Sequence, residues 1–307
     1  MPPKNNPRKS SSSAPRAKTT RQERPSRQEK SERQERPKRV ERPARQTRPS
    51  GQTQVERKAR PASTPKRSNP SGSMRLNRFI AHAGICSRRE ADTYISAGSV
   101  TVNGKVVSEM GYQVLTTDEV RFDGRLISSE RKEYVLLNKP KNFITTTSDE
   151  KGRRTVMELI ANASKQRLFP VGRLDRNTTG LLLFTNDGEL ADKLTHPKFG
   201  VRKIYHVVLS QALKVNHLQA IEAGITLDDG LVEVDAVSFI QGTTKREVGI
   251  EIHSGKNRIV RRIFEHLGYE VTKLDRVSFA GLTKKDLPRG HFRHLTEKEV
   301  SFLRMIG

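Results

Sequence analysis

The distribution of hydrophobic residues divides the chain into three parts. Residues 1–73 contain almost no large apolar side chains, and the pentapeptide RQERP and its variants recur through them with frequent proline. Proline at this frequency disfavours a helix, and no apolar residue recurs that could build a core. We therefore predict a disordered, basic tail over residues 1–73, followed by folded domains at residues 74–133 and 134–307.

In residues 74–133, helical periodicity is followed by strand-like alternation. Apolar positions three and four residues apart predict two short helices, the second of which begins with a capping box formed by Ser87 and Glu90. Alternating residues then surround Asn103-Gly104, which is a strong hairpin signal. This part is expected to be a compact module of two helices and a small sheet.

Residues 134–307 mix both periodicities without a regular βαβ repeat. The predicted strands are 134–137, 181–186, 202–210 and 246–255, and the predicted helices are 187–194, 214–224 and 257–268. The first strand is expected to stop at the tripeptide Asn138-Lys139-Pro140. The fold class is therefore α+β, with a mixed, mostly antiparallel sheet flanked by helices.

Charge narrows the class of partner. The 307-residue chain has a formal net charge of +24 and a sequence pI of about 10.5. Residues 1–73 hold 21 lysines and arginines against six acidic residues, and the remainder is also basic. A polyanion, above all nucleic acid, is the expected partner, and no basic amphipathic helix with an aromatic face favours a membrane. The tail could act as a solubilising segment or as a non-specific RNA tether.

Several chemistries are disfavoured by the residues present. Cys86 is the single cysteine, so no disulfide framework exists, and with no apolar run of signal or membrane-spanning type we expect a cytoplasmic protein. The pair His291 and His294 has no further metal ligand nearby in sequence, and neither a P-loop nor a G-x-S-x-G motif occurs. We expect no metal and no cofactor. A monomer is expected because no surplus apolar face stands out.

One acidic residue stands out as a candidate for chemistry. Asp175 lies between Arg173 and Arg176, just ahead of the apolar run 181–184. A neighbouring cation would keep a carboxylate ionised despite burial. The local pattern fits either a structural ion pair or a catalytic acid.

The whole of the first folded module resembles a known RNA-binding module. The stretch RLNRFIAHAGICSRREADTYISAGSVTVNGKVV is similar to the S4 domain. Arginines at the start of a helix oppose its dipole, which suggests phosphate contact, although solvated side chains would look the same. The resemblance implies that RNA is contacted by Arg75, Arg78, Arg88, Arg89 and Lys105.

The second resemblance concerns the catalytic segment. The stretch GRLDRNTTGLLLFTNDGELADKLTHP resembles the motif of the RsuA-like ribosomal RNA pseudouridine synthases, which carry an S4 domain ahead of the catalytic domain. The resemblance runs from about Met74 to Leu295. It implies that Asp175 is the essential aspartate, held ionised in a water-poor pocket, and that Arg173 enters the RNA stack when the target nucleotide leaves.

The same resemblance assigns the other candidate residues. Tyr205 would stack on the flipped base, although a core aromatic is also compatible with its position. Arg261 would pair with the aspartate. Ile259 stands where related enzymes often have Gln, so Arg258 or Arg262 could be the partner instead, and all three could contact RNA.

The implied reaction is isomerisation of one uridine. The sequence of the motif favours 23S rRNA as the substrate, with 16S rRNA as the alternative. A non-catalytic S4-type RNA-binding or ribosome-assembly factor is the alternative from another class.

Overall fold

The computed structural model describes residues 72–128 and 130–306, so the predicted tail lies outside the described residues except for its last two positions. The prediction was wrong at Ser73, which begins strand β1 (Ser73–Arg75) and pairs with Leu115 of β4. The first module contains helices α1 (Leu76–His82) and α2 (Arg88–Ser96), and strands β2 (Val100–Val102), β3 (Lys105–Val106), β4 (Gln113–Leu115), β5 (Val120–Phe122) and β6 (Arg125–Leu126).

Local sequence signals determine this module. The capping box is confirmed, because Ser87 Oγ accepts from the Glu90 amide and the Glu90 carboxylate accepts from the Ser87 amide. Asn103 and Gly104 both have positive φ, 51° and 78°, as a tight hairpin turn between β2 and β3 requires. A separate apolar core, which includes Leu76, Ile80 and Ile95, closes the module.

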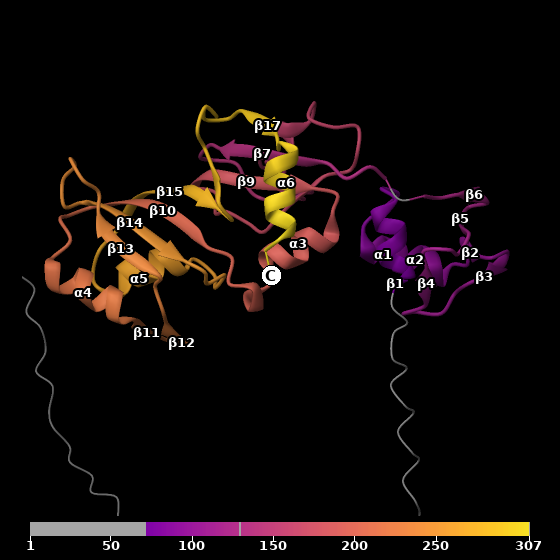
Figure 1. Ribbon diagram of the computed structural model, residues 1–307, viewed down its shortest axis with the longest axis horizontal. Coiled ribbons are helices and arrows are strands. Elements are labelled where there is room, and N and C mark those ends of the chain that lie inside the picture. The colour runs from indigo at the N-terminus through magenta and orange to yellow at the C-terminus, as the bar shows by residue number, and fades with distance from the viewer. Residues whose placement is uncertain (1–71, 129, 307) are drawn as a thin grey trace, which may run out of the picture. The chain divides into compact units, whose positions relative to one another are not determined.

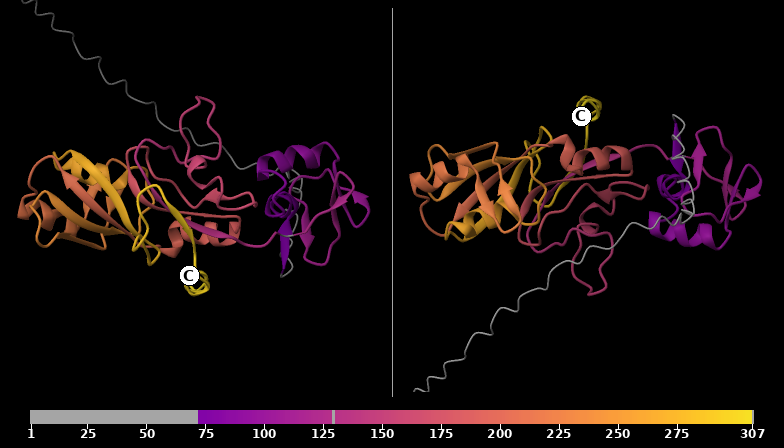
Figure 2. Two further views of the ribbon diagram at one scale, coloured as in Figure 1. Left: turned by 90° about the horizontal axis from the view of Figure 1, so that it is seen from above. Right: turned by 90° about the horizontal axis from the view of Figure 1, so that it is seen from below.

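The remaining chain is built on one large mixed sheet (Figures 1 and 2). Its main path runs β13-β14-β10-β15-β9-β7-β17, and only the pairing of β15 with β9 is parallel. The bounds are β7 (Tyr134–Lys139), β8 (Phe169–Pro170), β9 (Thr179–Thr185), β10 (Lys203–Leu209), β13 (Ala236–Phe239), β14 (Glu247–Ile252), β15 (Val271–Phe279), β16 (Leu282–Thr283) and β17 (Phe292–His294). The predicted α+β class is confirmed.

Helices cover both faces of this sheet. They are η1 (Glu158–Ile160), α3 (Gly188–Thr195), η2 (Pro197–Phe199), α4 (Val215–Ala223), α5 (Ile259–His266) and α6 (Glu297–Arg304), and β11 (Ile225–Leu227) pairs with β12 (Gly230–Val232) as a separate hairpin. Leu182 and Phe184 of β9 share one core with α4 and α5, while Leu181 and Leu183 share the other with α3 and α6. The continuous apolar run of β9 is therefore explained by burial on both sides.

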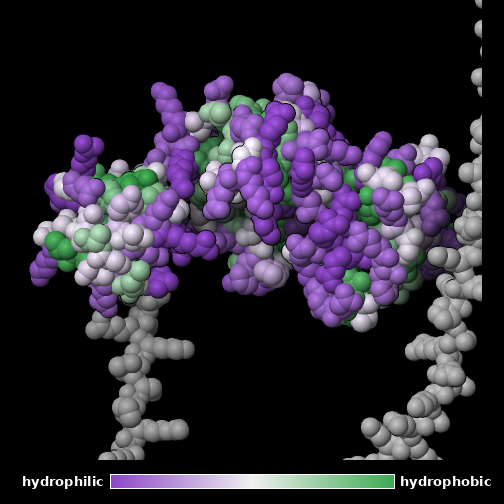
Figure 3. Space-filling model, turned by 180° about the vertical axis from the view of Figure 1, so that it is seen from behind, coloured by the Kyte–Doolittle hydropathy of each residue, from purple (hydrophilic) through white to green (hydrophobic). Residues whose placement is uncertain are grey.

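On the face shown in Figure 3, hydrophobic residues form scattered patches among hydrophilic ones. Among the described residues, no helix has the length and hydropathy needed to span a bilayer.

Candidate active site

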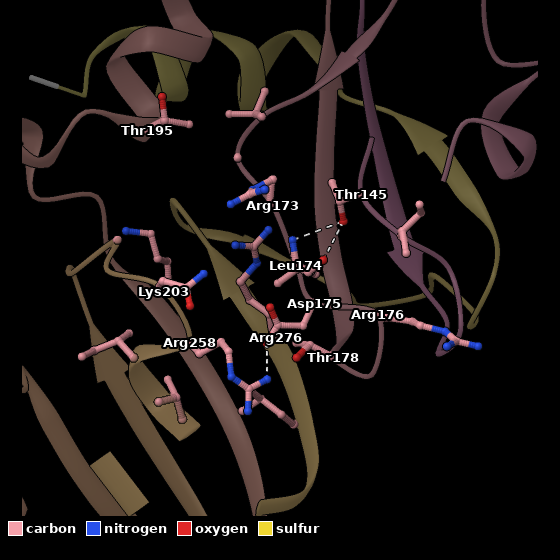
Figure 4. Close-up of a pocket in the computed structure, with 18 of the residues that line it drawn as sticks. Thr145, Arg173, Leu174, Asp175, Arg176, Thr178, Thr195, Lys203, Arg258 and Arg276 are labelled. Atoms are coloured by element: carbon pink, nitrogen blue, oxygen red, sulfur yellow. Dashed lines mark hydrogen bonds and ion pairs between the residues drawn. The ribbon is translucent and has the colours of Figure 1, made fainter. Parts of the chain in front are cut away.

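The loop between β8 and β9 places Asp175 at the wall of a cavity of about 630 Å³ (Figure 4). The loop is a tight turn, in which the Thr178 amide donates to the Asp175 carbonyl oxygen at 3.1 Å. The side chain of Asp175 is 36% exposed, so the predicted water-poor surroundings are absent in this structure. Asp175 instead lines the open cavity.

The side chain of a buried lysine forms hydrogen bonds to the backbone of this loop. Lys139 has no exposed surface, and its Nζ donates to the carbonyl oxygens of Thr178 at 2.9 Å, Asp175 at 3.0 Å and Pro140 at 3.1 Å. Burial lowers the pKa of Lys139 to about 8, and Asp175 acts in the opposite direction. The strand β7 continues through Lys139, so it ends two residues later than the predicted end at Leu137.

Two arginines of the helical segment reach the carboxylate. Arg258 Nη1 lies 3.5 Å from Asp175 Oδ2, and Arg261 Nε lies 3.8 Å from the same oxygen. Arg258 occupies the N-cap position of α5 with a φ of +47°, a strained conformation for a residue other than glycine. Arg261 is buried and donates through Nη1 to the Val271 carbonyl oxygen at 2.8 Å. Burial lowers the pKa of Arg261 below its usual value.

Not every predicted partner of Asp175 is near it. Arg262 pairs instead with Asp229, with Nη2 to Oδ1 at 2.8 Å, which removes it as the partner of the carboxylate. Arg173 and Arg176 are exposed, and within residues 72–128 and 130–306 neither forms an ion pair with Asp175. Arg173 and Arg176 both line the cavity, but the side chain of Arg176 points away from Asp175 (Figure 4).

The sheet forms the floor of the cavity. Tyr205 on β10 lines the cavity, is 9% exposed and also belongs to the apolar core. Its surroundings therefore fit both a residue that stacks on a base and a core aromatic. Directly opposite Tyr205 in the antiparallel register lies Arg276 of β15, which also lines the cavity. Lys203 of β10 contributes a further cation, and its pKa is lowered to about 8, chiefly by burial and then by Arg276.

Sequence reasoning missed Arg276, Lys203 and Lys139. Arg276 sits within the segment VTKLDRVSF, where charges interrupt the apolar pattern, and β15 itself was not predicted. The one available signal was the presence of isolated cations inside otherwise apolar strands, which indicates a buried polar role.

The predicted RNA contacts of the first module differ in exposure. Arg75, Arg88, Arg89 and Lys105 are exposed. Arg78 is half-buried, and its Nη2 lies 3.5 Å from Glu189 Oε1 and 3.8 Å from Asp192 Oδ2. Among the residues that the structure describes, no group of three or more His, Cys, Asp or Glu side chains is arranged to hold a metal ion.

Comparison with known proteins identifies the family. Residues 74–120 match the S4 domain model, and residues 133–266 match the model of the RNA pseudouridylate synthases. The chain is 42% identical over 236 residues to ribosomal large subunit pseudouridine synthase B of Bacillus subtilis, spanning 76% of this chain and 96% of that protein. It is 36% identical to the dual-specificity RNA pseudouridine synthase RluF of Escherichia coli K12, over 75% of this chain and 78% of RluF.

A solved structure of the same class of enzyme has a similar fold. A crystal structure of a pseudouridylate synthase, 30% identical in sequence, superimposes with a TM-score of 0.53 over 75% of this chain and 99% of that one. The chain belongs to the RNA pseudouridine synthases, in the RsuA-like branch that joins an S4 domain to the catalytic domain, and it is an enzyme of that class.

Proposed function

We propose that this enzyme converts one specific uridine of 23S rRNA to pseudouridine, and that Asp175 is the essential residue. The observation that supports this most strongly is the grouping around the cavity. One carboxylate lies within 3.8 Å of two guanidinium groups, those of Arg258 at the N-cap of α5 and Arg261 within it, and the phenol ring of Tyr205 lines the same space.

The reaction suits a site of this composition. The bond between N1 and C1′ breaks, a bond between C5 and C1′ forms at the same sugar, the C5 proton leaves, and N1 takes up a proton. Because no atom is gained or lost, we propose that neither cofactor nor metal takes part. Asp175 acts on the sugar, either as a nucleophile at C1′ or as a base. Both roles require the ionised carboxylate that Arg258 and Arg261 favour.

The target base must first leave the RNA stack. Flipping a nucleotide costs a few kcal/mol, and Arg173, exposed at the cavity, is suited to fill the vacated position. Tyr205 offers a flat face on which the detached uracil can be retained while it turns. The bound nucleotide would also cover Asp175, supplying the dry surroundings that the open cavity lacks.

The target RNA is proposed from the relatives and from charge. The Bacillus subtilis relative is named for the ribosomal large subunit, and the exposed cations Arg75, Arg88, Arg89 and Lys105 provide phosphate contacts on the S4 domain. Arg258 could bridge Asp175 and an RNA phosphate, since it is 45% exposed.

The test is a map of pseudouridine in rRNA from a deletion strain and from the same strain carrying the gene again. We expect one position in 23S rRNA to lose its pseudouridine and regain it on complementation. A missing position in 16S rRNA alone would contradict the proposed target. An unchanged map of both RNAs would contradict the proposed function.

A further inference from the structure

The floor of the cavity contains a charge that the proposed chemistry has not used. Arg276 is only 3% exposed, lies in the middle of β15 and lines the cavity (Figure 4). It is the residue opposite Tyr205 in the register of β10 and β15. It is therefore at the base of the site rather than at its mouth, where the exposed Arg173 and Arg258 are found.

The protein fixes the orientation of this guanidinium but leaves most of its donors free. Nε donates to the Leu181 carbonyl oxygen at 2.8 Å, and the guanidinium lies over the Phe279 ring, 4.5 Å from its centre. Arginine carries five N–H donors. Within residues 72–128 and 130–306 the other four have no hydrogen-bond partner, and Nη2 is buried and unpaired.

The local charge is also unbalanced. Among the described residues, no carboxylate lies within ion-pair distance of Arg276. After burial, the charge of Arg276 is the largest cause of the lowered pKa of Lys203. Lys203 uses its Nζ to donate to the carbonyl oxygens of His253 at 2.7 Å and Val201 at 2.8 Å, which are neutral. A buried cation without a counter-ion costs several kcal/mol, so its presence here favours a negatively charged ligand.

The backbone around Arg276 is held rigidly. At this point β9 approaches β15 in the parallel register that pairs Gly180 with Arg276. Gly180 has a φ of +108°, and a Cβ at this position would overlap the Arg276 carbonyl oxygen. Because Gly180 follows Thr178 of the catalytic loop by two residues, the loop and Arg276 are fixed relative to each other.

We propose that Arg276 is a further catalytic residue, which donates to a carbonyl oxygen of the target uracil and stabilises the negative charge on the detached ring. This inference rests on the proposed function. When the bond between N1 and C1′ breaks, its electron pair stays on N1 and spreads to the ring oxygens. The base enters deepest into the cavity and lies beside Tyr205, whereas the phosphates, which belong to the RNA backbone, remain at the mouth. A preorganised donor acts most strongly where charge develops during the reaction.

The test uses single-turnover kinetics on an rRNA fragment that contains the target uridine or 5-fluorouridine at that position. Fluorine makes the detached ring a weaker base, so this substrate needs less help from a cation. We expect Arg276→Gln to lower the rate of N-glycoside loss by about 100- to 1000-fold on uridine. The deficit should shrink on 5-fluorouridine, and the Kd for RNA should stay within a few-fold of wild type.

Two further variants complete the design. Arg276→Lys keeps the charge and should recover part of the rate, and it replaces the glutamine variant if that protein fails to fold. Arg202→Gln, at a site where the side chain is 75% exposed and pairs with Glu251, is the matched control and should behave as wild type.

Three outcomes would overturn the inference. A wild-type rate for Arg276→Gln would show that the donor is not used. An equal deficit on both substrates would show a structural role only. A wild-type enzyme that forms no pseudouridine on any rRNA would instead contradict the proposed function itself, and this inference with it.

Discussion

The buried Lys139 offers the sharpest test of how the catalytic loop is held. Lys139→Met keeps the length of the side chain but removes the ammonium group that donates to the carbonyl oxygens of Pro140, Asp175 and Thr178. The bonds to Asp175 and Thr178 join β7 to a loop more than thirty residues later in the sequence. Their loss should release the loop without unfolding the sheet.

The magnitude follows from two opposing effects. The loop carbonyls of Asp175 and Thr178 each lose a hydrogen bond from a charged donor, which is worth about 1.5–3 kcal/mol, or roughly 3–6 kcal/mol together. Burial lowers the pKa of Lys139 to about 8, so at about 1.4 kcal/mol per pKa unit the neutral methionine recovers about 3 kcal/mol. The free energy of unfolding should therefore fall by no more than about 3 kcal/mol.

The main effect of Lys139→Met should be on the catalytic rate rather than on the free energy of unfolding. A displacement of the reacting carboxylate by 1 Å can cost about 100-fold in rate, so we expect kcat to fall by about that factor. Urea denaturation measures stability, filter binding measures the Kd for rRNA, and single-turnover assays measure kcat. Lys141→Met is the matched control, because Lys141 is exposed two residues further along the chain. A folded Lys139→Met enzyme with the kcat of wild type would refute this explanation.

Three other predictions concern the fold and the RNA contacts. Gly180→Ala should lower the free energy of unfolding, measured in urea, by about 3 kcal/mol or more, because φ at this position is +108° and a Cβ would overlap the backbone. Gly242→Ala is the control, with φ +75° and open space around the position, and should cost only about 1–2 kcal/mol. Equal costs for the two variants would contradict this prediction. Burial alone would raise the pKa of Asp275, but hydrogen bonds from Arg289 and Lys284 lower it to about 2. Asp275→Asn should therefore cost about 2 kcal/mol of stability at pH 7, and the difference from wild type should disappear as the pH falls from about 4 to 2; a deficit independent of pH would contradict it. Replacing both Arg88 and Arg89 by Gln should weaken rRNA binding and reduce the slope of log K against log salt by about 1–2; an unchanged slope would show that they do not contact phosphate.

Local signals in the sequence were enough where neighbours in the chain are also neighbours in space. The capping box of Ser87 and Glu90, the turn at Asn103-Gly104 and the doubly buried strand β9 are set by short-range patterns, and all three are confirmed. The α+β class followed from the same patterns. The roles of Asp175 and Tyr205 stay predictions that came from the family resemblance.

Long-range pairing explains what the sequence did not reveal. The apolar pattern of β15 is interrupted by Asp275 and Arg276, and bulges in its pairing with β10 break the alternation. The charge of Asp275 is tolerated because a distant group, Arg289, pairs with it. Similarly, the cations next to Asp175 in sequence are not its ion-pair partners, which come from the helical segment 258–261. Local periodicity carries no information about such contacts.

The central claim is that the carboxylate of Asp175 performs the chemistry. Asp175→Asn keeps the shape of the side chain and removes its charge, so the direct measurement is pseudouridine formed in 23S rRNA by the purified variant in a single turnover. We expect no pseudouridine above background, with a Kd for the RNA within a few-fold of wild type. Product formation by Asp175→Asn at the rate of wild type would contradict the assignment.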